Sequence, residues 1–418
     1  MFKALGYEYY MAQRLGAGHA RTGAFIAVAG VACALAIMLL TWGIARGFNI
    51  GIKERLSGFE PQIKISAPYS YMTGKSDEFV VLSPELRKII STEIPSAKPS
   101  IAFRQPAIIK TDDNFETVVV CGFDANHDYT FSRDNIVAGI LPDFNSPAGD
   151  TTIVLSQRVV DKLGLKLNQK VTACYFIKDA IRSRRYRLAG IYNSGFGDYD
   201  ATVAYGSINA LQRLNRVDSL TGTSIELNNL DLTLDSLPSS AKRLQQALID
   251  NARNNGSGEV EVVDNICNTG AVYLNWLDLI ETNVVVIFAL MCLVAALTLV
   301  SSLFIIVLDR ISLVGLLRAM GATRKQVRRI FILIAMRLVI LGVVIGDFVA
   351  LGFGMLQKNF GIVSLDPEMY YLDKVPFSFD IPAIFLINTG VLFLSWAVLI
   401  IPAKVAADTS PARTIRYE

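Results

Sequence analysis

The chain has 418 residues, of which 52% are hydrophobic and 18% are charged, and its mean hydropathy is +0.40. This composition is too apolar for a typical soluble protein. The formal net charge of +3 says little about nucleic acid, but no pattern of interleaved basic and aromatic residues is present, so we expect no nucleic-acid partner.

Four apolar stretches are long enough to cross a bilayer, which takes about 20 residues of helix. We place transmembrane helices at residues 24–46, 282–308, 330–357 and 381–401. The first stretch exceeds the apolar core of a signal peptide, about 7–15 residues, so we expect an uncleaved anchor. Before it, residues 1–23 are predicted to form an amphipathic helix at the cytoplasmic interface, with Phe2, Leu5 and Tyr9 on one stripe.

Basic residues close to the spans predict the orientation of the chain. Residues 1–23, 309–329 and 402–418 are rich in Lys and Arg, which favours the cytoplasmic side for all three. Residues 358–380 carry more acids than lysines and are predicted to be an external loop. The large segment 47–281 is therefore expected to be an external domain, with both termini in the cytoplasm.

The external segment alternates strand-like and helix-like patterns, which predicts an α+β domain with its own core. Strands are expected at residues 62–66, 117–122, 152–155, 171–176, 186–192, 201–205, 223–227 and 259–263. Helices are expected to begin after the N-cap residues Ser83, Ser156, Ser207 and Ser239. Residues 251–258, rich in Asn, Gly and Ser, are predicted to be an exposed loop.

The sequence offers little for catalysis or metal binding. Cys121 and Cys174 lie in strand-like runs, so buried free thiols are favoured over a disulfide framework. The two histidines form no cluster with cysteines at metal-ligand spacing, and neither a phosphate loop nor a Ser/His/Asp set is present. We expect no catalytic residue, no metal site and no bound cofactor.

The basic segment between the second and third spans has one apolar helical face. That face is made by Ile311, Val314, Leu317 and Met320. Gly321 is expected to end this helix, and Thr323 followed by Gln326 matches a capping box at the next helix. A stiff amphipathic helix at the cytoplasmic face suits contact with a partner, and the alternative is an ordinary basic turn between two spans.

The third span carries four small residues at steps of four, which favour close helix packing and leave a functional gate as the second interpretation. They are Gly342, Gly346, Ala350 and Gly354. Asp347 lies inside the same span, where a carboxylate should face protein or water, and Asn388 or Thr389 could be its partner. A proton-relay role for Asp347 is the alternative.

Four passages together resemble permease subunits of the MacB/FtsX superfamily of ABC transporters. The passage LDRISLVGLLRAMGATRKQVRRIF is similar to the coupling-helix region of the family, and IPAKVAADTSPARTIRYE to its ending, where a Pro-Ala pair closes the last helix. The passages GFNIGIKERLSGFEPQIKI and IYNSGFGDYDATVAYGSINALQRL are similar to the LolC/LolE lipoprotein-releasing permeases. Residues 176–187 look too short for the hook with which LolC-type subunits hold a periplasmic carrier.

The resemblance implies an α-helical membrane protein with four transmembrane helices and a large α+β periplasmic domain, a MacB-like periplasmic core, between the first and second. It implies a permease subunit in the bacterial inner membrane that couples a partner ATPase to the release of lipoproteins toward the outer membrane. The chain would be no enzyme, since a separate ABC ATPase subunit would use ATP and Mg. A dimer with a second permease, the same or homologous, is implied, and a periplasmic lipoprotein carrier is left open as a further partner.

The resemblance also implies two sets of site residues. The ATPase-coupling residues would be Ile311, Val314, Leu316, Leu317, Arg318, Met320 and Gly321. The lipoprotein cavity between the first two spans would be lined by Ala32, Ala36, Leu39, Leu40, Phe48, Val285, Phe288 and Ala289, for which ordinary packing is the alternative. Two other functions stay open: a MacB-type efflux permease, and an FtsX-like mechanotransmitting module that controls a cell-wall hydrolase.

The charge pattern predicts the accessibility of two positions in intact spheroplasts. In a background without the natural cysteines, Asn254→Cys should react with a membrane-impermeant thiol reagent, because residues 47–281 are placed outside. Lys325→Cys should react only after permeabilisation. The reverse labelling pattern would refute the orientation.

Overall fold

The computed structural model describes residues 21–68, 79–111, 114–177, 180–256, 260–309, 318, 320–366, 370–372 and 374–408. The chain divides into two compact units. The helical unit comprises residues 1–49, 277–364 and 374–418, and the α+β unit comprises residues 50–276 and 365–373.

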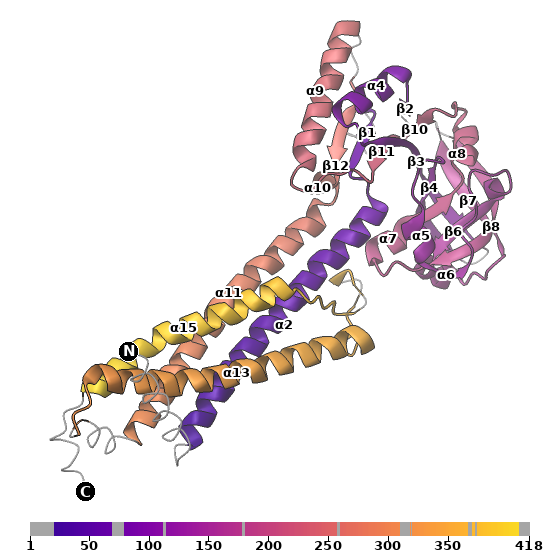
Figure 1. Ribbon diagram of the computed structural model, residues 1–418. Helices are drawn as coiled ribbons and strands as arrows, with labels where there is room; N and C mark the ends of the chain where they lie inside the picture. The colour runs from indigo at the N-terminus through magenta and orange to yellow at the C-terminus, as the bar shows by residue number, and fades with distance from the viewer. Residues whose placement is uncertain are drawn as a thin grey trace. The chain divides into compact units, whose positions relative to one another are not determined.

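Four long helices carry the apolar stretches of the chain (Figure 1). They are α2 (Arg21–Phe59), α11 (Ala271–Leu308), α13 (Arg324–Phe360) and α15 (Ile381–Asp408). All four are long and apolar enough to cross a membrane. Each helix contains its predicted span and extends beyond it, because helix-forming residues continue past the apolar stretch. The first 29 residues of α2, 21–49, belong to the helical unit.

Two predictions about the helix ends have clear outcomes. The capping box is confirmed, since the Thr323 side chain accepts from the Gln326 N–H and the Gln326 side chain accepts from the Thr323 N–H. The expectation that Pro402 closes the last helix is wrong, because α15 continues through it to Asp408. A proline removes one backbone hydrogen bond, here to the Val398 carbonyl, and the flanking turns can hold the helix together.

The α+β unit contains twelve strands among the described residues (Figure 1). They are β1 (Ile63–Ser66), β2 (Val80–Val81), β3 (Lys98–Lys110), β4 (Phe115–Phe123), β5 (Ile136–Gly139), β6 (Thr152–Ser156), β7 (Lys170–Ile177), β8 (Ala180–Tyr192), β9 (Val203–Gly206), β10 (Thr221–Gly222), β11 (Ser224–Asn228) and β12 (Val262–Asn265). Ten of them form one sheet in the order β12-β1-β11-β3-β4-β9-β6-β8-β5, with β7 pairing β3 and β8. Strands β2 and β10 form a separate pair.

Six of these strands close into a ring. The hydrogen-bonded neighbours run β3–β4–β9–β6–β8–β7 and return to β3. Inward-facing side chains fill a ring of this size. Phe103, Tyr175 and Tyr186 are fully buried, and the two tyrosine hydroxyls lie 2.9 Å apart and satisfy each other. The core of the α+β unit is therefore a filled barrel rather than an open sheet.

Short helices connect and cover these strands. They are α4 (Pro84–Glu93), α5 (Thr130–Asp134), α6 (Gln157–Leu163), α7 (Gly197–Thr202), α8 (Ile208–Asn215), α9 (Leu237–Asn255), α10 (Ile266–Thr269) and the 3-10 turn η1 (Gly149–Thr151). The predicted caps Ser83, Ser156 and Ser207 are confirmed, each accepting a backbone N–H with its side chain.

The predicted start of α9 is wrong. The helix begins at Leu237, after Ser236 instead of Ser239, because Pro238 fits the first turn of a helix. The loop predicted at residues 251–258 is also wrong in its first half, since α9 continues to Asn255. Leu244, Leu248 and Ala252 form a buried stripe that holds this end of the helix in place, and Gly256 ends it with a φ of +68°.

The longest missed element is β3. Its two prolines, Pro99 and Pro106, weakened the strand pattern in the sequence, because proline cannot donate a backbone hydrogen bond to a neighbouring strand. The pairing with β11 ends at Ala102 and the pairing with β7 begins at Ala107, so Pro106 lies in the gap between two partner strands. The strand predicted at residues 201–205 starts only at Val203, because residues 201 and 202 end α7. The strand predicted at residues 259–263 starts only at Val262.

All five cysteines lie in the described part of the chain and are free, which confirms the prediction of unpaired thiols. Cys121 is buried as predicted, and burial raises the pKa of its thiol to about 11. It is therefore protonated and unreactive at neutral pH. Cys174 is partly exposed and its Sγ lies 3.5 Å from the Ser183 Oγ.

Candidate transport site

The helical unit has a core in which all four long helices take part. Val31 and Leu35 of α2, Val339 of α13 and Leu399 of α15 are completely buried, and Leu303 of α11 is nearly so. The apolar side chains that cover this core from outside are ordinary for a membrane helix.

The small-residue stripe of α13 brings this helix against α2. A Cβ atom at Gly342 would lie 2.9 Å from the Cβ of Val31 and 3.0 Å from the Val28 carbonyl oxygen. A Cβ atom at Gly346 would lie 2.8 Å from the Ala32 carbonyl oxygen. These are backbone contacts that only glycine permits without a shift of the helices.

Helices α2 and α11 are also in direct contact along much of their length. A Cβ atom at Gly30 would lie 2.4 Å from the Thr298 methyl carbon. Further along, the Trp42 and Phe288 ring centroids are 6.4 Å apart, and the Asn49 amide donates to Glu281 at 2.8 Å. No open cleft therefore separates α2 from α11 at these described positions.

The structure distributes the eight predicted cavity residues over three environments. Ala32, Ala36, Leu39 and Phe48 are buried within the chain. Leu40 and Phe288 are partly buried against the core of the helical unit. Val285 and Ala289 are exposed, with Val285 68% exposed. The eight residues therefore do not share one environment within the single chain, and their place in a cavity stays a prediction.

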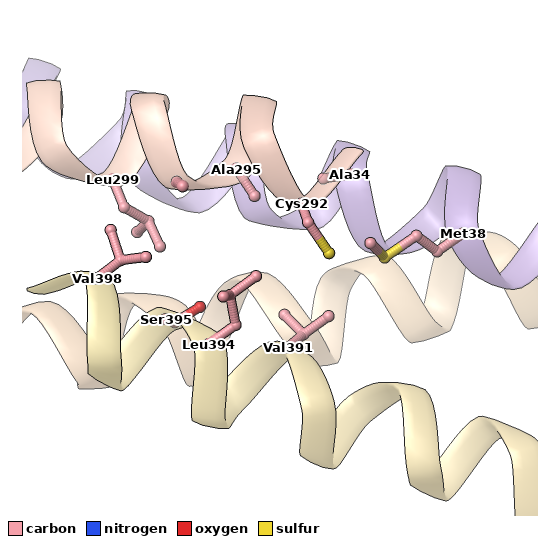
Figure 2. A pocket seen from close by; sticks show the side chains of 10 residues that line it. Ala34, Met38, Cys292, Ala295, Leu299, Val391, Leu394, Ser395 and Val398 are labelled. Atoms are coloured by element: carbon pink, nitrogen blue, oxygen red, sulfur yellow. The ribbon is translucent and has the colours of Figure 1, made fainter. Parts of the chain in front are cut away.

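A small apolar pocket lies elsewhere, between α2, α11 and α15 (Figure 2). It is lined by Ala34, Met38, Cys292, Ala295, Ala296, Leu299, Val391, Leu394, Ser395 and Val398. Its volume of about 10 Å³ is near the least that holds one water molecule, so no acyl chain fits in this form. Sequence reasoning missed these residues, and the only available signal was the small side chains of Ala295, Ala296 and Ser395.

Asp347 has the partner that the sequence suggested. The Asn388 amide of α15 donates to both carboxylate oxygens of Asp347 on α13, at 3.0 and 3.1 Å. Thr389, the other option, donates instead to the carbonyl oxygen of Phe385 in its own helix. The pair ties α13 to α15 with two side-chain hydrogen bonds.

The predicted coupling segment is described only in part. Ile311, Val314, Leu316 and Leu317 lie outside the described residues. Arg318 is helical, Met320 is 66% exposed, and Gly321 has a φ of +98°. The left-handed backbone at Gly321 is typical of a helix end. The next helix, α13, begins directly after its N-cap residue Thr323.

The α+β unit holds two features that sequence reasoning did not find. Arg104 donates to Glu226 from both Nε and Nη2 and to the Phe59 carbonyl, which makes a buried ion pair at the barrel rim. Asp200 is buried and accepts from the Ser194 hydroxyl at 2.7 Å, and burial raises the pKa of its carboxyl group. Both sets bind backbone groups, Arg104 the Phe59 carbonyl and Asp200 the Ser194 N–H.

The β7–β8 hairpin contains residues 176–187, the segment that the sequence predicted to be too short for a hook. Its strands pair from Lys170 opposite Arg187 to Ile177 opposite Ala180. The described residues thus form a regular ladder without an inserted segment. In the described parts of the chain, no group of three or more His, Cys, Asp or Glu side chains is placed to hold a metal ion.

Two family descriptions match the chain. The MacB-like periplasmic core domain matches residues 24–248, and the FtsX-like permease C-terminal region matches residues 285–411. Together they cover both units.

Curated relatives match over nearly the whole length. The lipoprotein-releasing system transmembrane protein LolC of Xylella fastidiosa (strain Temecula1) is 22% identical, over 99% of this chain and 98% of the relative. LolC of Neisseria meningitidis serogroup B is 23% identical over 94% of each chain. The lipoprotein-releasing system transmembrane protein LolE of Haemophilus influenzae is 21% identical over 92% of this chain and 92% of the relative.

The packing of α13 on α2 predicts a difference between two glycines of one helix. Gly346→Leu should lower the melting temperature of the purified protein, since overpacking costs about 1–3 kcal/mol. Gly352→Leu is the matched control, because a Cβ atom there meets nothing within 4 Å. Equal melting temperatures for the two variants would contradict the contact.

Proposed function

We propose the function of this chain from one premise: it belongs to the FtsX-like permeases that carry a MacB-like periplasmic core domain. A chain of this family is a transport subunit and not an enzyme. Its four apolar helices and its α+β domain have separate tasks in such a subunit, one in the membrane and one outside it.

The transport that we propose is the release of lipoproteins from the inner membrane toward the outer membrane. The observation that carries the proposal is the similarity, over 92% or more of the chain, to relatives named as lipoprotein-releasing transmembrane proteins. Similarity to a single domain would not distinguish release from efflux. A match that runs through both units supports the same function, lipoprotein release, for this chain and its relatives.

Lipoprotein release needs an external source of energy. Each buried CH₂ of an acyl chain contributes about 0.8 kcal/mol to membrane binding, so a multiply acylated protein does not leave the bilayer spontaneously. We assign the ATP hydrolysis and the Mg to a separate ABC ATPase subunit. Arg318, Met320 and Gly321, with the preceding residues Ile311, Val314, Leu316 and Leu317, are the proposed contact with that subunit.

The receiving cavity is proposed to lie between two permease subunits, which are identical or homologous. Within one chain, α2 and α11 touch at Gly30 and at Trp42, which leaves no room for acyl chains between them. The exposed face of α11 at Val285, Leu290 and Leu293 is apolar and open to a neighbour. A second subunit facing this surface would complete an apolar cavity next to Leu40 and Phe288.

The proposed orientation follows the charge pattern of the sequence. Both termini and the segment around Lys325 would be cytoplasmic, and the α+β unit periplasmic. Because the β7–β8 hairpin carries no inserted hook among its described residues, we favour a LolE-like position for this chain. The periplasmic carrier would then bind chiefly to the second permease subunit.

Photo-crosslinking tests the substrate directly. Crosslinkers at Leu40 and at Phe288 should trap acylated lipoprotein in membranes that contain the whole complex, and ATP should reduce the trapped fraction. A crosslinker at Phe348 on α13, which is 81% exposed, is the control for general lipid contact.

The competing functions give different results. Trapping of a soluble peptide or a drug at Leu40 would favour an efflux permease. Trapping of phospholipid alone, equally at all three positions, would favour a signalling module and would refute lipoprotein release.

A further inference from the structure

Residues 374–380, which we call the strap, lead directly into α15 and lie against α2 and α13. A Cβ atom at Gly43 of α2 would lie 2.4 Å from the Phe377 ring, and one at Gly354 of α13 would also lie 2.4 Å from it. The ring therefore occupies a notch made by two glycines on two helices. Any side chain at either glycine would collide with it.

The strap is fastened to α2 on both sides of this ring. The Pro376 carbonyl oxygen would be 2.6 Å from a Cβ atom at Gly47, and the Ser378 N–H donates to the Gly43 carbonyl at 3.0 Å. Asp380 lies 3.9 Å from Arg46, which is a weak, exposed ion pair. The two glycines of α2 thus accept the strap backbone as well as its aromatic side chain.

On α13 the strap is held by a buried amide. Gln357 is only 2% exposed, and its Nε2 donates to the carbonyl oxygens of Val363 and Val375 at 3.0 Å each. Its Oε1 accepts from the Val363 N–H at 2.9 Å. A buried amide with its hydrogen bonds satisfied fixes the backbone it binds, because leaving those groups unpaired is costly.

The ring changes the relation between α2 and α13 along their length. At Gly342 and Gly346, α13 meets the backbone of α2 directly. Two turns further, at Gly354, the nearest atoms are those of the Phe377 ring and no longer those of α2. The two helices touch at one level and are held apart by an aromatic ring at the next.

We propose that Phe377 is a spacer that positions α2 for lipoprotein release. Its ring sets the distance between α2 and α13 at the level of Gly43, less than one turn from Leu40 on the proposed cavity wall. The inference rests on the proposed function, and it adds a positioning residue that does not touch the substrate. Loss of the ring would let α2 approach α13 and withdraw that wall from the second permease.

The test measures lipoprotein released per ATP hydrolysed, in vesicles that contain the complete complex and a triacylated lipoprotein. Phe377→Ala should lower this ratio at least fivefold while the complex still assembles and hydrolyses ATP. Phe377→Leu, which keeps most of the volume, should stay within twofold of the natural protein. Phe385→Ala is the control, since it removes an aromatic ring near the start of α15 that is 73% exposed and is not among the atoms nearest to either glycine.

A compensating pair makes the test specific for spacing. Gly43→Ala should lower the ratio because its methyl group collides with the ring, and adding Phe377→Leu should restore it. The spacer is overturned if the double variant is no better than Gly43→Ala alone. It is also overturned if Phe377→Ala and Phe385→Ala give the same ratio.

Failure of the proposed function has a different signature. If the natural complex releases no lipoprotein, the spacer is judged by the melting temperature alone. Gly43→Ala should then lower the melting temperature in the natural background and not in the Phe377→Ala background. An equal decrease in both backgrounds would overturn the spacer whatever the substrate is.

Discussion

The backbone contact between α13 and α2 is the constraint on which the helical unit depends. Gly342 and Gly346 let α13 lie against the carbonyl groups of Val28 and Ala32, a distance that no larger residue allows. Apolar burial alone gives little reason for two helices to associate in a bilayer, since lipid chains are equally apolar. Close packing of this kind, together with the Asp347–Asn388 hydrogen bonds, supplies the attraction that holds α2, α13 and α15 as one body.

This constraint also decides where substrate can bind. With α2 held by α13 on one side and in contact with α11 on another, the described residues leave no open cleft between α2 and α11 for an acyl chain. The pocket between α2, α11 and α15 has a volume of only about 10 Å³. We therefore propose that the substrate lies between two permeases, and that ATP hydrolysis by the partner subunit acts on the position of α2.

The sequence predicted the parts of the structure that depend on local signals. Serine caps, the Thr323 capping box, most strands and all four apolar helices follow from residue type and spacing within a few positions. The sequence also predicted the partner of Asp347, because a carboxylate inside an apolar span requires a polar partner on a neighbouring span. Such features are fixed by the chemistry of the residues themselves.

What the sequence did not predict depends on contacts between distant segments. Strand β3 pairs with β4 along its length and with β11 and β7 on its other side, and Pro106 is accommodated in the gap between those two partners. The exposure of the eight cavity residues depends in the same way on how α2 is packed. Phe377 carries no signal at all in a single sequence, since its role exists only where Gly43 and Gly354 meet.

The central claim is that this chain serves the release of acylated protein from the membrane. The most direct measurement follows a triacylated lipoprotein in vesicles that contain the chain, its second permease and the ATPase, with a lipoprotein carrier in solution. The account predicts that ATP moves the lipoprotein into the soluble fraction, and that a non-hydrolysable nucleotide does not. Active ATP hydrolysis with all of the lipoprotein still in the vesicles would contradict it.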